Sequence, residues 1–319
     1  MKKISLNQDE PITISECFEQ YIVRCKVRNL SEKTLDIYKV HFSVLEKYSI
    51  VADWSLNSIN LSAIDGFILY LKERGCNDIT VQSYLRDLRA FFYFCMDNGW
   101  MPQFKIKLPK ADKKIKETYT DEELKILLKK PNLKTSDFTE YKTWVYSNYL
   151  LATGNRISSV LNIKIGDLDF DNQLIQMNTS KNRKAQIIPM SDSLAIILKE
   201  YLSYRKGTDS DYLFCNSYGQ KSDLRTYQEM LVKYNRSKGV MKTSSHLYRH
   251  TFAKKWILNG GDIFRLQKLL GHSDLTVVRE YVNMFSSDLS LNYSQFNPLD
   301  TMSNMINKTR VTMNRKNKQ

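Results

Sequence analysis

Three groups of cationic side chains and one tyrosine have the chemistry needed to transfer a phosphoryl group without a metal ion. Arg156 ends the run Thr153-Gly-Asn-Arg, His246 begins the run His-Leu-Tyr-Arg-His, and His272 stands nine residues before Tyr281. Arginine binds phosphate oxygens through a planar, permanently charged fork, and an activated tyrosine hydroxyl can attack phosphorus. With 19 tyrosines in the chain, Tyr281 alone would be an ordinary residue at the edge of a core. Its combination with the cationic groups upstream indicates a nucleophile aimed at a phosphate.

The residues around the second cationic group predict a helix. The pair Ser244-Ser245 can cap a helix that begins at His246, on which Arg249 and His250 fall at positions i+3 and i+4. The three side chains therefore share one face near a helix N-terminus, where free N–H groups and the macrodipole favour an anion. His250 also has a simple explanation as a buried, hydrogen-bonded residue, and it is left outside the predicted site.

Glycines set the ends of the elements that carry the other groups. Gly154 can turn the chain so that Arg156 starts a new helix, and the plain alternative for this arginine is an ion pair with an acid. Gly271 is expected to end a helix immediately before His272, and Tyr281 lies on the helix that follows.

Residues 13–99 are predicted to form four helices, each with an apolar stripe at helical spacing. Capping residues are expected at Thr13 with Glu16, at Ser31, and at Ser62 with Asp65. The fourth helix, residues 79–97, carries Arg86, Arg89 and Tyr93 on the side away from its apolar stripe. That side could lie in a DNA groove, and the alternative is an ordinary solvated face.

Residues 100–118 interrupt the helical pattern and carry a high density of lysine. Pro102 and Pro109 stop helices, and like charges repel one another, so an extended segment is expected. The pattern predicts a linker between two domains that follows phosphates across a duplex. Its DNA-binding candidates are Lys105, Lys107, Lys113 and Lys114.

After the linker, the pattern changes to helices that enclose a few short strands. Thr120 and Glu123 form a further capping box, and a long apolar helix follows over residues 140–152. Residues 191–243 are predicted to be mostly helical, with one short strand at 212–215. Three earlier strands, with a basic hairpin at 178–184 between the last two, are expected at 167–170, 173–177 and 185–190. The predicted fold class is mainly α with a small antiparallel β-sheet in the second domain.

The composition favours a polyanionic partner. The chain has 319 residues, enough for two domains, and a net charge of +14, which favours nucleic acid because neutralised phosphates release condensed counterions. Its five cysteines form no Cys-x-x-Cys pair, so neither a zinc site nor a disulfide framework is indicated. The sequence has no run of about 18 apolar residues, no signal peptide and no glycine-rich phosphate loop. We expect a reduced, cytoplasmic protein that binds double-stranded DNA, with no metal, no cofactor and no membrane partner.

In this order and at these separations, the motifs resemble those of the tyrosine recombinases, also called phage integrases. Thr-Gly-Asn-Arg156 is similar to the first arginine box of that family, and His246 with Arg249 is similar to its H-x-x-R box. Leu-Gly-His272 followed by Tyr281 is similar to its third box. Four boxes in order, counting a hairpin lysine, make chance agreement improbable.

The resemblance also singles out one lysine of the basic hairpin. Lys181 stands eight residues before Pro189, as the hairpin lysine of the family stands before its closing proline. Arg183 and Lys184 belong to the same hairpin and remain alternatives for its role.

The resemblance covers nearly the whole chain and implies a two-domain clamp around DNA, with a helical core-binding domain and an α+β catalytic domain. The expected parts are a core-binding domain at 1–100, a basic linker at 101–118, a catalytic domain with a C-terminal helix at 119–307 and a disordered basic tail at 308–319. The absence of an arm-binding domain before the first helix is similar to compact Xer-like recombinases and to small mobile-element integrases.

The resemblance implies cleavage and rejoining of DNA without metal or ATP. Tyr281 would attack the phosphate and pass its proton to His246, while Arg156 and Arg249 would grip the non-bridging oxygens. His272 would donate a hydrogen bond to the phosphate, and Lys181 would protonate the departing 5′-oxygen. The products would be a 3′-phosphotyrosine link and a free 5′-hydroxyl, which a second 5′-hydroxyl can attack to reseal the strand.

Two positions depart from the family pattern. Ser159 stands where an acidic residue is common, three places after the first arginine, which puts in doubt how that arginine is held. Tyr248 stands where leucine is common, and its hydroxyl must find a place.

The leading hypothesis is a site-specific recombinase that acts as a homo-tetramer on two duplexes through a Holliday junction and integrates or excises a mobile element. Resolution of chromosome or plasmid dimers, as by Xer-like proteins, is the alternative, and an accessory DNA-bending or directionality factor is a further expected partner. A topoisomerase-like relaxase and a catalytically silent DNA-binding protein are the other classes considered. An apolar stripe near the C-terminus would pack either on its own catalytic domain or on a neighbouring protomer; it consists of Leu299, Met302 and Ile306.

Overall fold

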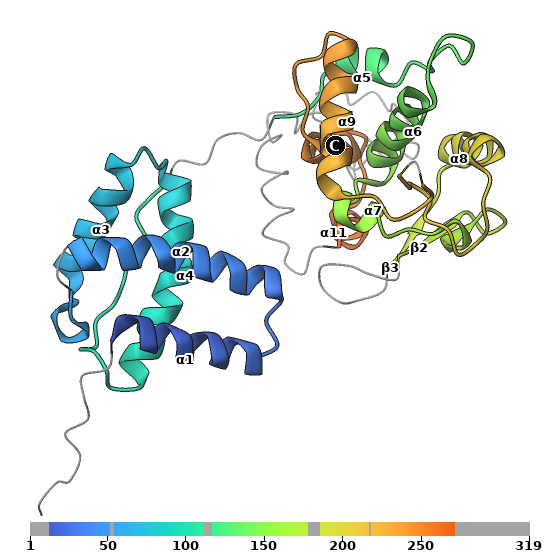
Figure 1. Ribbon diagram of the computed structural model, residues 1–319. Coiled ribbons are helices and arrows are strands. Elements are labelled where there is room, and N and C mark those ends of the chain that lie inside the picture. The colour runs from blue at the N-terminus through green and yellow to red at the C-terminus, as the bar shows by residue number, and fades with distance from the viewer. Residues whose placement is uncertain (1–12, 52–53, 112–116, 178–185, 217, 272–319) are drawn as a thin grey trace, which may run out of the picture. The chain divides into compact units, whose positions relative to one another are not determined.

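The computed structural model describes residues 13–51, 54–111, 117–177, 186–216 and 218–271. The chain divides into two compact units between Lys114 and Ile115, and each unit has a buried core of its own (Figure 1). Helices dominate both units, and one small antiparallel sheet lies in the second, so the predicted fold class is confirmed.

The described residues of unit 1 form four α-helices and one short 3₁₀ turn. These elements are α1 (Ile14–Val27), α2 (Glu32–Val51), η1 (Leu56–Ser58), α3 (Leu61–Glu73) and α4 (Asp78–Asp97). The predicted capping box of Thr13 and Glu16 is confirmed, and Ser31 Oγ accepts the backbone N–H of Thr34 at 3.3 Å. The predicted cap of α3 at Ser62 is wrong, because the Asn60 side chain accepts a backbone N–H and begins this helix.

Aromatic rings hold the helices of unit 1 together. Phe18 of α1 stacks on Phe42 of α2 with ring centroids 3.8 Å apart, and both rings meet Phe91 of α4 edge-on. Aromatic pairs of this kind contribute about 0.5–1.5 kcal/mol each beyond the burial of their surface. The predicted apolar stripe of α4 is confirmed, since its buried residues include Val81, Leu85, Leu88, Phe92 and Cys95.

After α4, residues 100–111, here called the strap, run back along that helix without forming helix or strand. The N–H of Ile106 donates to the Tyr93 hydroxyl at 3.2 Å, near the C-terminal end of α4. Further along, the Gln82 side chain near the helix start donates to the carbonyl of Pro109 at 2.5 Å. The strap is extended, as predicted, and it packs against the core of unit 1.

Unit 2 is built from helices around a three-stranded antiparallel sheet in the order β1-β2-β3. Its helices are α5 (Asp121–Leu127), α6 (Phe138–Thr153), α7 (Ile157–Val160), α8 (Asp192–Arg205), α9 (Leu224–Ser237), α10 (Ser245–Leu258) and α11 (Ile263–Leu270). Its strands are β1 (Leu168–Asp169), β2 (Leu174–Met177) and β3 (Gln186–Pro189), preceded by the 3₁₀ turn η2 (Ile165–Asp167). The three strands agree with the prediction. The strand predicted at 212–215 is wrong, because its end residues Tyr212 and Cys215 form only isolated bridges.

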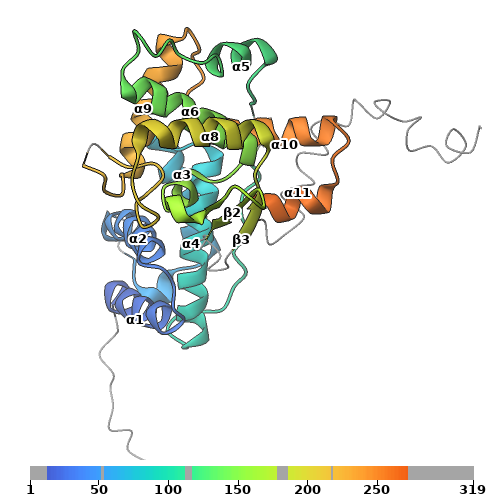
Figure 2. The same ribbon diagram turned by 90° about the vertical axis from the view of Figure 1, so that its right-hand side faces the viewer.

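Helix α6 is the centre of unit 2 and packs against α8, α9 and α10. Its Tyr146 and Tyr149 are fully buried and meet the ring of Phe214 edge-on, at 5.1 and 5.7 Å between centroids. Figure 2 shows α10 and α11 side by side, with β3 next to α11. None of the helices in the described ranges is both long and apolar enough to span a bilayer.

Lys142 is a charged residue inside this core. Its side chain is only 8% exposed, and its ammonium donates to the carbonyl of Cys215 at 3.0 Å and lies over the ring of Tyr227. Burial, helped by the positive charge of Arg205, lowers the pKa of Lys142 below its ordinary value. The folded protein therefore carries this charge under a penalty that the unfolded chain does not have.

We expect Lys142→Met to change how the stability of the protein depends on pH. Between the lowered pKa of Lys142 in the folded state and its ordinary value near 10.4, the unfolded chain binds more protons, so wild-type stability rises with pH. The free energy of unfolding of the wild type, minus that of the variant, should rise from pH 7 to about 10. Urea titrations at several pH values measure this difference, and Lys125→Met on the exposed face of α5 controls for the lost charge. A difference independent of pH would contradict the prediction.

Candidate active site

Arg156 is placed by the end of one helix and the start of the next. Helix α6 ends at Gly154, which has the left-handed backbone angle φ +61°, and Arg156 is the N-cap residue of α7. A side chain at Gly154 would collide with Phe252, because an added Cβ would lie 2.5 Å from that ring. The turn thus needs glycine both for its backbone angle and for the close approach of α10.

The two other described members of the predicted site lie one turn apart on α10. Ser244 caps this helix, as predicted, by accepting the N–H of His246 at 3.3 Å. The His246 side chain reaches the surface, whereas Arg249 is 5% exposed. His250 stands beside His246, with 6.4 Å between the ring centroids.

The buried guanidinium of Arg249 joins three stretches that are far apart in the sequence. One of its terminal nitrogens donates to the carbonyl of Gly154 at 2.8 Å, and the other donates to the carbonyl of Leu270 at 2.7 Å. These carbonyls lie at the C-terminal ends of α6 and α11, where helices leave carbonyls unpaired and carry partial negative charge. The carbonyl dipoles thus stabilise the buried positive charge.

The surroundings of His246 lower the pKa of its imidazole. Partial burial of the imidazole, and then the positive charges of Arg249 and Arg156, lower the pKa of His246 below its ordinary value. Both arginines are therefore close enough to act electrostatically on this side chain. At neutral pH the imidazole is predominantly uncharged and able to accept a proton.

The two strands that flank the basic hairpin are anchored on the same region. Met177, the last residue of β2, accepts a hydrogen bond from the buried Asn155 side chain, 3.2 Å from nitrogen to sulfur. Gln186, the first residue of β3, donates to the carbonyls of Lys268 and Leu269 at 2.6 and 2.9 Å. The end of β2 thus meets the loop before Arg156, and the start of β3 meets the C-terminal end of α11.

Several predicted site residues lie outside the described ranges, so the structure does not place them. They are Lys181, His272 and Tyr281 among the catalytic candidates and Lys113 and Lys114 among the DNA-binding candidates. Within the described ranges, no cluster of histidine, cysteine, aspartate or glutamate could hold a metal ion.

The DNA-binding candidates of unit 1 lie along α4 and the strap. Arg86 is exposed and Arg89 is half-buried, and Lys105 and Lys107 are exposed on either side of the buried Ile106. Extended backbone turns alternate side chains to opposite sides, so packing one residue inward exposes both of its neighbours. Tyr93 is half-buried, and its hydroxyl is engaged by the strap.

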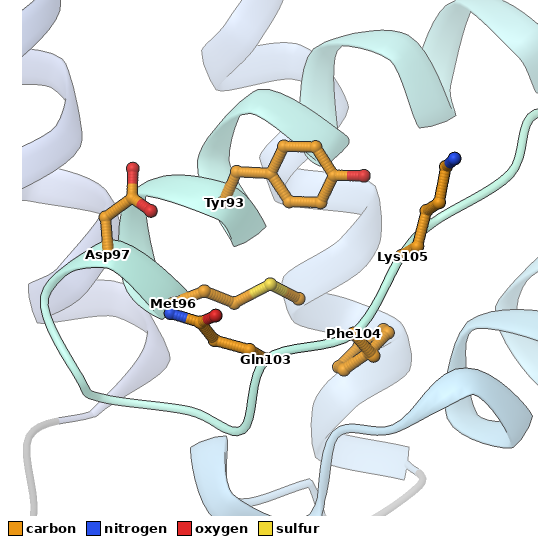
Figure 3. A pocket seen from close by; sticks show the side chains of 6 residues that line it. All are labelled: Tyr93, Met96, Asp97, Gln103, Phe104 and Lys105. Carbon is orange, nitrogen blue, oxygen red and sulfur yellow. The ribbon is translucent and has the colours of Figure 1, made fainter.

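An open hollow of about 400 Å³ lies where α4 and the strap diverge (Figure 3). Tyr93 and Met96 of α4 and Phe104 of the strap form its apolar lining, and Asp97 and Lys105 bring opposite charges to it. It belongs to unit 1 and includes none of the predicted catalytic residues.

Comparison with known proteins identifies the chain. Residues 117–287 match the phage integrase family, and residues 13–116 match the SAM-like domain of phage integrases. The chain belongs to the phage integrase family of tyrosine recombinases. It is accordingly an enzyme of the tyrosine-type, site-specific recombinase class.

Curated relatives of this tyrosine recombinase cover most of its length. The tyrosine recombinase XerD of Oceanobacillus iheyensis is 27% identical over 286 residues, which are 85% of this chain and 94% of that protein. The tyrosine recombinase XerD of Listeria monocytogenes is 28% identical over 283 residues, with the same coverage of both chains.

Solved structures share the fold of this recombinase. The Tn1549 transposon integrase in complex with a circular intermediate DNA has a TM-score of 0.72 and 22% identity, and the match covers 88% of this chain and 99% of that one. The XerH site-specific recombinase bound to its difH substrate has a TM-score of 0.70 and 21% identity, with 88% and 84% covered.

The two departures from the family pattern have different structural settings in this recombinase. Ser159 is half-buried on the short helix α7, and its N–H donates to the carbonyl of Arg156 at 2.9 Å. Tyr248 is completely buried, with its ring 4.7 Å from that of Tyr119, and burial raises the pKa of its hydroxyl to about 12. The larger side chain is therefore accommodated in the core of unit 2.

The sequence did not predict the residues that hold the segments of the candidate site by hydrogen bonds. Asn155, Gln186 and Tyr119 each bind a segment that carries a site candidate, yet they are ordinary polar residues with no catalytic pattern of their own. Only Asn155 had a local signal, because it stands inside the first arginine box.

We expect Gly154→Ala to destabilise the protein more than Gly239→Ala. Both glycines have positive φ, which disfavours alanine by about 1–2 kcal/mol, but an added Cβ at Gly239 meets nothing within 4 Å. At Gly154 the collision with Phe252 should remove about 1–3 kcal/mol more, as overpacking does. Urea denaturation of both variants measures the difference, and equal losses would show that α10 can move aside.

Proposed function

We propose that this recombinase cleaves and rejoins DNA at specific sites through a covalent link between Tyr281 and a 3′-phosphate. The observation that carries the proposal is the effect on His246 of two arginine charges, Arg249 and Arg156, which come from two separate motifs. A phosphate oxygen gains charge in the transition state, and fixed positive groups stabilise it most where water is excluded.

The proposed roles follow from the charge state of each group. A tyrosine hydroxyl has a pKa of about 10, so Tyr281 needs a base, and the lowered pKa of His246 makes its imidazole a suitable acceptor. Arg156 and Arg249 hold the non-bridging oxygens. His272 donates a hydrogen bond to the phosphate.

Lys181 is proposed as the acid that protonates the leaving 5′-oxygen. The anchoring of β2 at Asn155 and of β3 at the end of α11 supports this role, because the two strands that flank the hairpin segment lie against segments with site candidates. Arg183 and Lys184 remain the alternatives within the hairpin.

In this mechanism the Tyr281 oxygen forms a bond to phosphorus while the bond from phosphorus to the 5′-oxygen breaks. The tyrosine proton goes to His246, and the 5′-oxygen takes a proton from Lys181. The phosphotyrosine link conserves the energy of the phosphodiester, so a second 5′-hydroxyl reverses the step without ATP or a metal. A homo-tetramer on two duplexes would exchange strands in this way through a Holliday junction.

Unit 1 is proposed to bind the duplex through α4 and the strap. Support comes from the exposed Arg86 and from Lys105 and Lys107, which point away from the core on either side of Ile106. We retain the proposed parts: a core-binding domain to residue 100, a linker to 118, a catalytic domain to 307 and a basic tail.

Integration or excision of a mobile element is the proposed biological role, supported by the shared fold with a transposon integrase that was solved with a circular intermediate DNA. Resolution of chromosome or plasmid dimers is the second candidate. It is favoured by the XerD relatives, of which the match covers 94%.

We expect Tyr281→Phe to abolish covalent capture of DNA while binding persists. Nicked duplexes from the flanks of the gene lose a short 5′-hydroxyl fragment after cleavage, which traps the phosphotyrosine link. Denaturing gels should show an adduct with the wild type and none with the variant, and the length of the released fragment locates the cleavage site. An adduct that survives in Tyr281→Phe would overturn the choice of nucleophile. Failure of the wild type to react with any bound fragment would favour a silent DNA-binding protein.

Removal of two strap lysines, in Lys105→Ala with Lys107→Ala, should weaken DNA binding in a salt-dependent manner. Each phosphate contact contributes about 0.9 to the slope of log K against log salt, so the slope should become shallower by about 2. Fluorescence anisotropy at several salt concentrations measures it. The matched control removes Lys125 and Lys129, two exposed lysines of unit 2 that are not proposed to contact DNA. An equal change in the control would contradict a specific role for the strap.

A further inference from the structure

Tyr119, at the start of unit 2, is bound to the catalytic helix from two sides. Its side chain is 3% exposed, and its backbone N–H donates to Thr251 Oγ1 on α10 at 2.9 Å. Its hydroxyl donates to the carbonyl of Lys242, in the loop before α10, at 3.3 Å. The same hydroxyl accepts a hydrogen bond from the Asn235 side chain at 2.9 Å.

The loop before α10 is fixed by further bonds to the same segment. The Lys242 carbonyl also accepts from Asn235 at 2.7 Å, and the Lys242 ammonium donates to the carbonyl of Thr118 at 3.1 Å and to Glu123 at 3.0 Å. Two residues after Lys242, Ser244 caps α10 through the N–H of His246. The position of this loop therefore sets where the helix begins.

The contact between the Tyr119 backbone and Thr251 holds α10 at a point beyond Arg249. Thr251 Oγ1 donates to the carbonyl of Leu247 at 2.7 Å while it accepts from Tyr119. The ring of Tyr119 also packs against Tyr248, which lies between His246 and Arg249 in the sequence. Tyr119 thus contacts the loop before α10, Tyr248 within the turn that carries both site residues, and Thr251 after that turn.

We propose that Tyr119 is a positioning residue for strand cleavage, which acts through α10 on His246 and Arg249. The inference rests on the proposed function, since it concerns the placement of the proposed base and of an arginine that binds the phosphate. Displacements of about 1 Å can slow an enzymatic reaction about 100-fold, so a buried hydroxyl that fixes a catalytic helix matters beyond its share of stability.

The experiment compares Tyr119→Phe with Tyr201→Phe. Each variant deletes one buried tyrosine hydroxyl that donates to a backbone carbonyl, at 3.3 Å to Lys242 for Tyr119 and at 3.2 Å to Leu213 for Tyr201. The Tyr201 hydroxyl bonds outside α10 and the loop before it, so it controls for loss of stability. Single-turnover cleavage of a nicked duplex is measured with saturating protein, together with the dissociation constant for DNA.

We expect Tyr119→Phe to reduce the cleavage rate at saturation by 10-fold or more, with unchanged DNA affinity, and Tyr201→Phe to cleave like the wild type. In a plot of cleavage rate against pH, the fall in rate on the acid side should also move to higher pH. His246 is faced by Arg249, Arg156 and His250, and a base released from burial and from the arginine charges regains a higher pKa. A variant that is only less stable would not shift this fall in rate.

A second pair of variants tests the other contact of Tyr119. Thr251→Val removes the oxygen that accepts the Tyr119 N–H and should slow cleavage, whereas Thr251→Ser keeps that oxygen and should recover most of the rate. Equal rates and pH profiles for Tyr119→Phe and Tyr201→Phe, or equal rates for Thr251→Val and Thr251→Ser, would overturn the proposal. If the wild type forms no adduct, or Tyr281→Phe still forms one, the proposed function itself fails.

Discussion

The arrangement of the catalytic unit depends on one buried charge, the guanidinium of Arg249. Helices leave their last carbonyls without partners, and two such ends, those of α6 and α11, converge on this side chain. A planar fork with donors on separate nitrogens can serve two carbonyls at once in a fixed geometry, whereas an ammonium group is a compact point charge on a flexible stem. The bonds join the loop before Arg156, helix α10 and the segment before His272, so a single side chain holds three sequence motifs in register.

The same charge also sets the chemistry of the neighbouring residues. Partial burial of the imidazole is the main cause of the lowered pKa of His246, and the positive charge of Arg249, followed by that of Arg156, lowers the pKa further. A phosphate that binds beside these groups meets positive charge that the fold has already desolvated and oriented. The stability of the fold and the electrostatics of the reaction therefore rest on the same contacts, which constrains both the geometry at Gly154 and the packing of α11.

Local features could be predicted from sequence because their physics is local. The capping boxes of Thr13 and Thr120 and the end of α11 at Gly271 follow from rules that span three or four residues. The predicted start of α3 at Ser62 was wrong because asparagine and serine are nearly equal caps, and Asn60 comes before Ser62. The candidate site residues were also chosen from sequence, since arginine, histidine and tyrosine have the side chains that the proposed chemistry requires. The anchors behind them were not, because the bonds of Asn155, Gln186 and Tyr119 join residues 22, 82 and 132 positions apart.

Hydrogen bonds also hold the last described segment of unit 1 and the first described residues of unit 2, each within its own unit. The strap leaves unit 1 tied along α4 by Tyr93 and Gln82, and α4 is the helix proposed to face DNA. Near the start of unit 2, Thr118 accepts a hydrogen bond from the loop before α10, and Tyr119 donates one to α10 itself. The strap is therefore fixed to α4, which is proposed to bind DNA. Tyr119 is fixed to α10, which is proposed to take part in catalysis. At the start of unit 2, the ring of Tyr119 packs against Tyr248, so this residue contacts the turn of α10 that carries both His246 and Arg249.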